Sequence, residues 1–293
     1  MTLIRDSHEI LTEADFERIS DVVYKHCGIN LHDGKKELVR ARIAKQLRVG
    51  GYKSARAYVD HVLRDTEGDD FYDFIDSLST NLTSFFREIG HFHHLTDTFL
   101  PALFARRKKD GGINNRIRAW SAGCSTGEEP YSLALTLLDA ADTAGPPSPG
   151  GAWDIKLLAT DISTRVLRRA KKGHYAQERV ASIPPKMKAG GRVVPIPGPR
   201  GSEKLYEPSP EVRNLISFRY LNLMEAWPFS GPFDFIFCRN VMIYFDKPTQ
   251  QKLVGRYHDL LESGGLLFTG HSESLTGIAH KFKYVQPTIY QKP

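Results

Sequence analysis

The sequence is poor in cysteine and contains no long apolar run. Its 293 residues include three cysteines, Cys27, Cys124 and Cys238. Their odd number, wide separation and lack of a Cys-x-x-Cys pair support neither a disulfide framework nor a thiolate metal site. No stretch of about 18 uninterrupted apolar residues suggests a membrane span, and no apolar run near the N-terminus suits a signal peptide. We therefore expect a cytoplasmic protein with reduced thiols and no direct membrane insertion.

The composition is that of a folded chain with a basic surface. Hydrophobic residues make up 41% of the chain and charged residues 25%, which is enough to bury a sizeable core in two domains. The formal net charge is +6 and the isoelectric point is about 9.1. This charge favours an acidic partner, and composition alone leaves open whether that is nucleic acid, an anionic membrane or an acidic protein surface.

Residues 1–78 show helical periodicity without a strand signal. Thr12 and Asp15 have the spacing of a capping box, and Gly28 ends the apolar pattern that follows. Further helices are expected from Asp33 to Gly50, from Ser54 to about Arg64 and from Asp69 to about Leu78. The prediction is an all-helical N-terminal domain over 1–78, followed over 79–115 by a linker helix.

From residue 116 onward, apolar runs alternate with helical stretches, which is typical of a parallel sheet with crossover helices. The expected strands are Ile117 to Ala122, Ile155 to Thr160, Leu215 to Tyr220, Phe233 to Cys238 and Leu266 to Thr269, with a strand pair between Tyr284 and Tyr290. The expected crossover helices begin near Glu129, Ser163 and Pro248. Residues 174–214 are too many for a simple connection, so we expect an inserted hairpin subdomain. The predicted fold class is α/β, a doubly wound domain over 116–293 with this insert, preceded by the all-α domain.

The first expected strand leads through a glycine-containing turn into a helix. Gly123 and Gly127 in this turn let the backbone approach a bound nucleotide closely. Glu128 and Glu129 would lie at the helix N-terminus, where they repel a pyrophosphate and suit a ligand with a positive amino group. The competing interpretation is that both acids only complement the helix dipole. Asp161, after the second strand, is placed either to accept ribose hydroxyls or to cap the next helix.

Three segments together resemble the chemoreceptor glutamate methyltransferase (CheR) family: residues 81–88 (NLTSFFRE), 122–130 (AGCSTGEEP) and 238–245 (CRNVMIYF). The resemblance implies a Rossmann-like, S-adenosylmethionine-dependent enzyme that methylates glutamate side chains of methyl-accepting chemotaxis proteins and releases S-adenosylhomocysteine. It implies no metal. The residues that it assigns to the cofactor site are Asn81, Thr83, Arg87, Glu129, Asp161, Asn222, Leu223, Arg239 and Asn240.

Arg87 and Tyr244 are the candidates for aligning the substrate. A glutamate side chain has a pKa of about 4.3, so at neutral pH it is already a carboxylate and needs no general base. The enzyme must hold a carboxylate oxygen in line with the methyl carbon and the sulfur, so the rate gain comes mostly from positioning. An arginine fork can fix the carboxylate plane and a tyrosine hydroxyl can direct one oxygen. The alternative for Arg87 is a salt bridge to Glu88 or another local acid.

The family also implies partners: the acidic cytoplasmic helices of chemoreceptors, and a receptor C-terminal peptide held as a tether by the hairpin insert. No nucleic acid is implied. Between Lys35 and Arg48, three basic residues recur on adjacent turns, namely Arg42, Lys45 and Arg48. They are candidates for receptor docking, although a solvated face is the usual meaning of such a stripe. The insert departs from the expected form between Pro195 and Pro210, so the tether stays open.

Several other patterns have simpler explanations. Residues 270–274 (GHSES) resemble a hydrolase nucleophile elbow, but the last position is not glycine and no suitable acid and histidine follow. His91, His93 and His94 lie on an apparent amphipathic helix without a matching ligand cluster, so we expect packing or partner contacts and not a metal. Residues 106–109 (RRKK) indicate a solvated end of the same helix.

Two other classes of protein compete with a receptor methyltransferase. A nucleic-acid methyltransferase would suit the basic charge, but Asn240 is followed by Val241 and Met242 and not by the Pro-Pro-aromatic run usual for base methylation. A non-catalytic, cofactor-sensing adaptor could retain the fold, but the presence of Arg87 and Tyr244 disfavours it.

Overall fold

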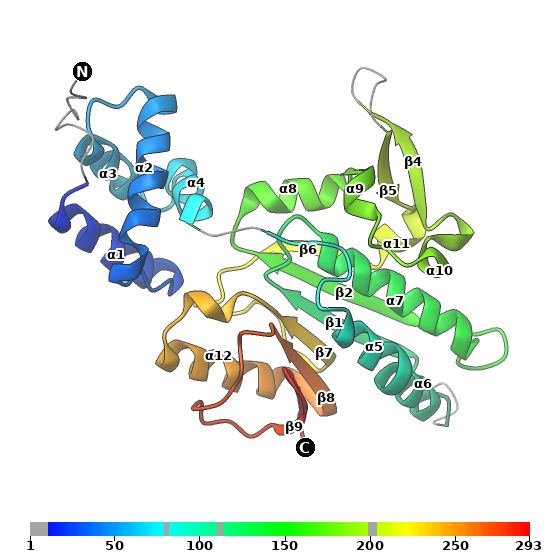
Figure 1. Cartoon of the computed structure of the whole chain (residues 1–293). Helices are drawn as coiled ribbons and strands as arrows, with labels where there is room; N and C mark the ends of the chain where they lie inside the picture. Colours follow the sequence, from blue (N-terminus) through cyan, green and yellow to red (C-terminus); the bar gives the residue numbers. More distant parts are fainter. Residues whose placement is uncertain (1–10, 79–81, 110–113, 199–203) are drawn as a thin grey trace. The chain divides into compact units, whose positions relative to one another are not determined.

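The computed structural model describes residues 11–78, 82–109, 114–198 and 204–293, which form two compact units (Figure 1). The first unit holds the described residues 11–78 together with Asn222–Ala226 and Tyr244–Thr249. The second unit holds the remainder of the chain from residue 82 onward. No helix of the described residues is both long and apolar enough to cross a membrane.

The first unit contains the helices α1 (Glu13–Cys27), α2 (Lys36–Gly50), α3 (Ala55–Arg64) and α4 (Asp69–Leu78). Thr12 caps α1 by accepting a hydrogen bond from Asp15 N at 3.1 Å, as the sequence predicts. The helix expected from Asp33 begins three residues later, at Lys36. Asp33 begins a 3-10 turn, η2 (Asp33–Lys35), which the His32 side chain caps by accepting from Gly34 N.

Two short segments from later in the chain pack within this helical unit. Asn222 Nδ2 donates to the His26 carbonyl at 2.6 Å, and Asn30 N donates to the Tyr244 carbonyl at 2.8 Å. Tyr24 donates its hydroxyl to Asp246 Oδ2 at 2.8 Å. The helices therefore hold the segments Asn222–Ala226 and Tyr244–Thr249 by backbone as well as side-chain contacts.

The second unit is built on a seven-stranded sheet of order β6-β2-β1-β7-β8-β10-β9. Its strands are β1 (Arg116–Ala122), β2 (Asp154–Asp161), β6 (Ile216–Tyr220), β7 (Phe233–Cys238), β8 (Leu261–Thr269), β9 (Lys283–Gln286) and β10 (Ile289–Gln291). The first five strands in this order are parallel, and the final pair is antiparallel. The predicted strands are all present. β8 starts earlier than expected, because Ser263, Gly264 and Gly265 interrupt its apolar pattern.

Crossover helices cover both faces of the sheet (Figure 1). They are α7 (Glu128–Ala144) and α8 (Thr164–Lys172) on one face and α12 (Lys247–Leu260) on the other. The segment before β1 forms α5 (Ile89–His94), the π-helical turn η3 (Leu95–Phe99) and α6 (Leu100–Lys109). The fold is thus the predicted doubly wound α/β domain preceded by an all-α domain.

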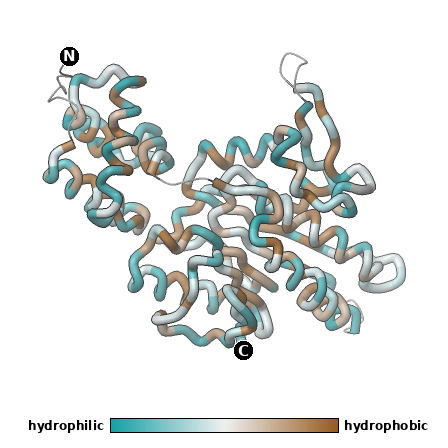
Figure 2. Tube along the Cα trace, in the orientation of Figure 1, coloured by the Kyte–Doolittle hydropathy of each residue, from teal (hydrophilic) through white to brown (hydrophobic). Residues whose placement is uncertain are grey.

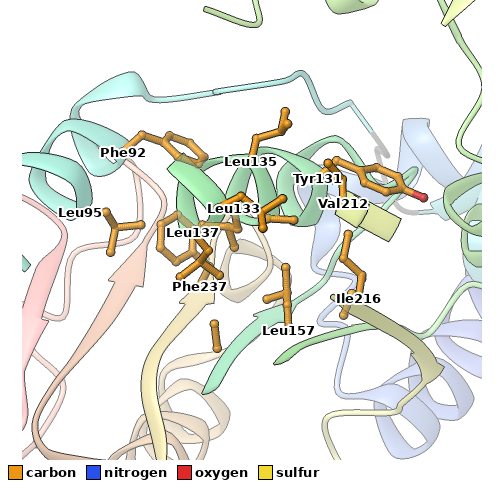
Figure 3. Packing of buried hydrophobic residues seen from close by; sticks show 14 of the residues in the cluster. Phe92, Leu95, Tyr131, Leu133, Leu135, Leu137, Leu157, Val212, Ile216 and Phe237 are labelled. Atoms are coloured by element: carbon orange, nitrogen blue, oxygen red, sulfur yellow. The ribbon is translucent and has the colours of Figure 1, made fainter. Parts of the chain in front are cut away.

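A continuous core joins α7 to the sheet. In Figure 3, Leu133 and Leu137 of α7 point toward Leu157 of β2 and Phe237 of β7, and all four side chains are fully buried. Figure 2 shows the contrast with α8, most of whose residues are hydrophilic. α8 buries only Val166, Leu167 and Ala170. This core fixes the strand ends that carry the site.

The predicted insert is a small antiparallel sheet of order β3-β5-β4. Its elements are β3 (Tyr175–Ala176), α9 (Gln177–Val180), α10 (Pro185–Lys188), η4 (Ala189–Gly191), β4 (Val193–Pro197), β5 (Lys204–Pro208) and α11 (Pro210–Asn214). β4 and β5 form the expected hairpin, with Pro195 opposite Tyr206.

One prediction about the end of α6 is wrong. Arg107 is not solvated but 6% exposed. Its Nη2 atom donates to Asp234 Oδ1 at 2.9 Å and to Glu262 Oε2 at 2.5 Å. Burial of a cation is tolerable here because two carboxylates compensate it.

Candidate functional site

The glycine-containing turn lies at the carboxyl edge of the parallel strands, between β1 and α7. Strand order reverses at β1, which has β2 on one side and β7 on the other, and ligands of such sheets bind at this switch point. Gly123 and Cys124 donate their N–H groups to the Thr160 carbonyl, both at 2.8 Å. Gly123 has a φ of 95°, and a Cβ there would lie 2.2 Å from Val241 Cγ2, so only glycine fits.

The two acids after this turn have different environments. Glu129 accepts a hydrogen bond from Ser121 Oγ at 2.8 Å through Oε1, and its Oε2 atom lies 3.7 Å from Arg239 Nε. Burial raises the pKa of Glu129, and Arg239 opposes that shift. Glu128, by contrast, is fully buried in an ion pair with Arg179. Arg179 thus occupies Glu128, and the prediction of a positive ligand is left to Glu129.

Asp161 ties the turn to the next helix. Its Oδ2 atom accepts from Ser125 N at 2.8 Å, and its Oδ1 atom accepts from Ser163 N at 2.9 Å. Ser163, not Asp161, is the N-cap of α8, where it accepts from Val166 N. That Asp161 also accepts from ribose hydroxyls stays a prediction.

Arg239 connects the segment after β7 with the segment before α5. It is 5% exposed, and its Nη2 atom donates to the Arg87 carbonyl at 2.6 Å. Its Nε atom lies 3.4 Å from Glu88 Oε2 and 3.7 Å from Glu129 Oε2. One buried cation thus fixes two carboxylates and the backbone of Arg87. The Arg87 side chain donates to the Leu82 carbonyl at 2.8 Å and has no ion pair to Glu88.

A buried carboxylate that sequence reasoning missed shapes the turn after Arg239. Glu273 is 6% exposed. It accepts N–H bonds from Asn240 at 2.6 Å, Ile243 at 3.0 Å and Gly270 at 2.7 Å. These bonds hold Asn240 at a φ of 59°. Glu273 belongs to the segment 270–274, which resembles a nucleophile elbow. Its partner Asn240 lies about 30 positions earlier in the sequence, so the segment itself gives no sign of this role.

The remaining predicted cofactor residues are placed as follows. Thr83 is half-buried in the segment 82–88, and Asn81 lies outside the described residues. Asn222 and Leu223 are buried in the first unit. The Asn222 amide is engaged there with the His26 carbonyl, Glu225 Oε1 and Met224 N. The structure thus gives Asn222 a local packing role that sequence reasoning did not foresee.

The residues predicted to meet substrate or receptor lie partly in the same unit. The half-buried Tyr244 belongs to the first unit, where its carbonyl is held by Asn30. In α2, Lys45 and Arg48 are exposed and Arg42 is half-buried. The neighbouring cations Lys36 and Arg40 pair with local acids. Arg42, Lys45 and Arg48 have no ion pair among the residues that the structure describes.

The acceptor groups at the switch point fit S-adenosylmethionine. This cofactor presents an ammonium group and ribose hydroxyls, all hydrogen-bond donors, and no phosphate. Glu129 and Asp161 supply carboxylate acceptors at adjacent strand ends. The acids at the start of α7 disfavour the pyrophosphate of a dinucleotide. Fold and site together define an S-adenosylmethionine-dependent methyltransferase.

Comparison with known proteins specifies the family. Residues 81–291 match the family described as CheR methyltransferase, SAM binding domain, and residues 14–79 match CheR methyltransferase, all-alpha domain. Chemotaxis protein methyltransferase 2 of Pseudomonas aeruginosa is 40% identical over 280 residues, 95% of this chain and 93% of that protein. The chemotaxis protein methyltransferase of Escherichia coli is 39% identical over 281 residues, 96% of this chain and 91% of that protein. The chain belongs to the CheR methyltransferase family.

Cofactor affinity tests the placement of the two acceptors. Glu129→Gln and Asp161→Asn are each expected to weaken S-adenosylmethionine binding by about 1–3 kcal/mol, because each removes a charged acceptor. Isothermal titration calorimetry measures this directly. Glu128→Gln is the matched control, because Glu128 pairs with Arg179. The cofactor affinity of this variant should stay at the wild-type value. Unchanged affinity in both acceptor variants would contradict the site.

Proposed function

We propose that this protein transfers the methyl group of S-adenosylmethionine to glutamate side chains of bacterial chemoreceptors, giving glutamate methyl esters. The observation that carries the proposal is the group formed by Arg239, Arg87, Glu88 and Glu129, in a chain of the CheR family. Arg239 donates to the Arg87 carbonyl and lies 3.7 Å from Glu129 Oε2, and Glu129 is the carboxylate that we assign to the cofactor ammonium.

The chemistry that this site must perform is modest. Bound S-adenosylmethionine supplies an electrophilic methyl group. The glutamate substrate arrives as a carboxylate, so no described side chain has to remove a proton. We assign Arg87 to orienting the carboxylate plane and Tyr244 to directing one oxygen. The hydrogen bond from the Arg87 side chain to the Leu82 carbonyl holds one edge of the guanidinium in a fixed direction.

The reaction is tested with labelled S-adenosylmethionine and receptor-enriched membranes. Methyl label should enter the receptor fraction and be released as methanol in mild base, because carboxyl esters hydrolyse there. Label that is stable to base would contradict glutamate methylation. Incorporation into added nucleic acid and not into receptor would favour the competing nucleic-acid methyltransferase.

We also propose that α2 docks on the acidic receptor helices. Its three cations without local partners, Arg42, Lys45 and Arg48, are spaced on successive turns of one helix. Complementary charge raises association rates. Lys36 and Arg40 contribute less in this proposal because Glu13, Asp33 and Glu37 already pair with them.

The triple variant Arg42→Glu, Lys45→Glu, Arg48→Glu is expected to slow receptor methylation by about tenfold or more through lost steering. Added salt should slow the wild-type reaction likewise, since screening acts beyond about 8–10 Å. The control is Lys35→Glu, Lys36→Glu, Arg40→Glu, with the same change in net charge. Docking through α2 is rejected if the two triple variants show equal rates and equal salt dependence.

The hairpin insert is the proposed place for a receptor C-terminal peptide. Among the described residues β4 pairs with β5 alone, so one edge of this strand is open to an added strand. A receptor lacking its C-terminal peptide should then be methylated more slowly.

A further inference from the structure

Three potential metal ligands converge beside Arg239. Glu88 precedes α5, His91 lies in α5, and His271 follows β8. One ligand atom of each lies within 4.8 Å of the others. Glu88 Oε2 is 3.6 Å from His91 Nδ1 and 3.8 Å from His271 Nε2. Glu88 and His271 reach His91 from separate segments, so the sequence around His91, His93 and His94 does not reveal this group.

The hydrogen bonds of His91 leave its Nδ1 lone pair unused. Thr288 donates its hydroxyl to the Pro287 carbonyl at 2.7 Å. The same oxygen lies 2.8 Å from His91 Nε2. In the tautomer with its proton on Nε2, His91 donates to Thr288 and Nδ1 keeps its lone pair. His91 is 2% exposed, and its Nδ1 atom has no hydrogen-bond partner among the described residues.

The atom that faces this lone pair is also an acceptor. Glu88 Oε2 is buried and likewise makes no hydrogen bond within the described part of the chain. Two acceptors that face each other at 3.6 Å are stabilised when a positive ion lies between them. His271 Nε2 supplies a third donor atom on the solvent side, where its side chain is 63% exposed.

We propose that Glu88, His91 and His271 form a binding site for one Zn²⁺ ion. Two histidine nitrogens and one carboxylate oxygen are a donor set of zinc sites that keep a position open for water. Bonds of about 2.0–2.1 Å in a tetrahedron require ligand atoms about 3.3 Å apart. The observed separations from Glu88 Oε2, 3.6 and 3.8 Å, are close to this value. All three ligand atoms lie within 4.8 Å of one another, and the exposed His271 is the ligand that can move to complete the tetrahedron.

Outer partners typical of a zinc site are also present. Metal-binding histidines donate their second ring nitrogen to a fixed acceptor, and ligating carboxylates are themselves supported. Thr288 takes the first role at His91. Arg239 takes the second, with its Nε atom 3.4 Å from Glu88 Oε2. The ion is not needed for the chemistry of methyl transfer. It would set the charge beside Arg239, which holds the Arg87 backbone.

Binding of Co²⁺, a spectroscopic substitute for Zn²⁺, tests the proposal with untagged, chelator-treated protein. Wild type should bind one Co²⁺ ion and show the visible absorption band of Co²⁺ with a low coordination number. Added Zn²⁺ should displace the Co²⁺. His271→Ala is expected to lower affinity by more than about 100-fold, and Thr288→Val by about 10–100-fold through the His91 tautomer. His93→Ala is the matched control, because His93 is exposed on the same helix outside the cluster.

Loss of the band in His271→Ala with retention in His93→Ala supports the site. A band that survives in His271→Ala, or that disappears in His93→Ala, overturns it in favour of binding by surface histidines. Absence of one-to-one binding by the wild type also overturns it, and the three side chains are then a packing cluster. Circular dichroism of each variant separates lost binding from lost folding.

Discussion

Arg239→Met is expected to lower the free energy of unfolding by about 3–5 kcal/mol, because it leaves buried carboxylates uncompensated. Arg239 is 5% exposed, and the side chains of its neighbours Glu88 and Glu129 are 11% and 13% exposed. Methionine keeps the bulk that packs over Phe92 and Phe237. The loss of stability therefore reports the removal of the charge. Cofactor affinity should fall as well, since Glu129 loses the cation that orients it.

Urea denaturation and calorimetry measure the two effects. Arg116→Met, an exposed arginine at the start of β1, is the control and should change stability by less than about 0.5 kcal/mol. Adding Glu129→Gln to Arg239→Met should recover part of the lost stability, because the two residues are coupled. Additive losses in the double variant would show that Arg239 does not act on Glu129.

Tyr244→Phe and Arg87→Lys should each reduce the rate of methyl transfer by about 10²-fold, because small misplacements of an aligned substrate have effects of this size. Tyr244→Phe removes only the hydroxyl that we assign to one carboxylate oxygen. Arg87→Lys replaces a planar fork with a point charge, and it also removes the hydrogen bond to the Leu82 carbonyl.

Single-turnover rates at saturating cofactor measure this effect apart from binding. S-adenosylmethionine affinity should remain near wild type in Tyr244→Phe, which separates alignment of the substrate from binding of the cofactor. Tyr284→Phe, a change of the same kind at an exposed residue of β9, is the control. A wild-type rate in either variant would contradict the role in substrate alignment that we assign to the substituted residue.

Features set by local contacts were predictable from the sequence. Thr12, Ser54 and Ser163 cap the helices expected to start after them, because each bond spans only three residues. The positions of the strands were predictable from apolar runs, which the core buries. The glycine turn and Asp161 each follow a predicted parallel strand. Their place at one edge of the sheet was therefore predictable.

Features set by distant contacts were not predictable in this way. Arg107 belongs to a run of four basic residues, and its partners Asp234 and Glu262 lie 127 and 155 positions away. The amide of Asn222 bonds a carbonyl 196 positions earlier, a contact for which the sequence has no signal. Glu273 was hidden for the same reason. A buried charge has no local signal, because the partner that compensates it can come from anywhere in the chain.

The helical unit includes the segments Asn222–Ala226 and Tyr244–Thr249. The N-terminal helices therefore cannot be exchanged between relatives as one continuous stretch of sequence. Met224 occupies the space beside Gly28, where a Cβ would lie 2.6 Å from its sulfur, and Asp246 is held by Tyr24. A chimera that exchanges the helices at residue 80 keeps both contacts only if the second protein carries matching residues at 224 and 246. A safer exchange transfers three stretches of sequence together, although they are far apart in the chain.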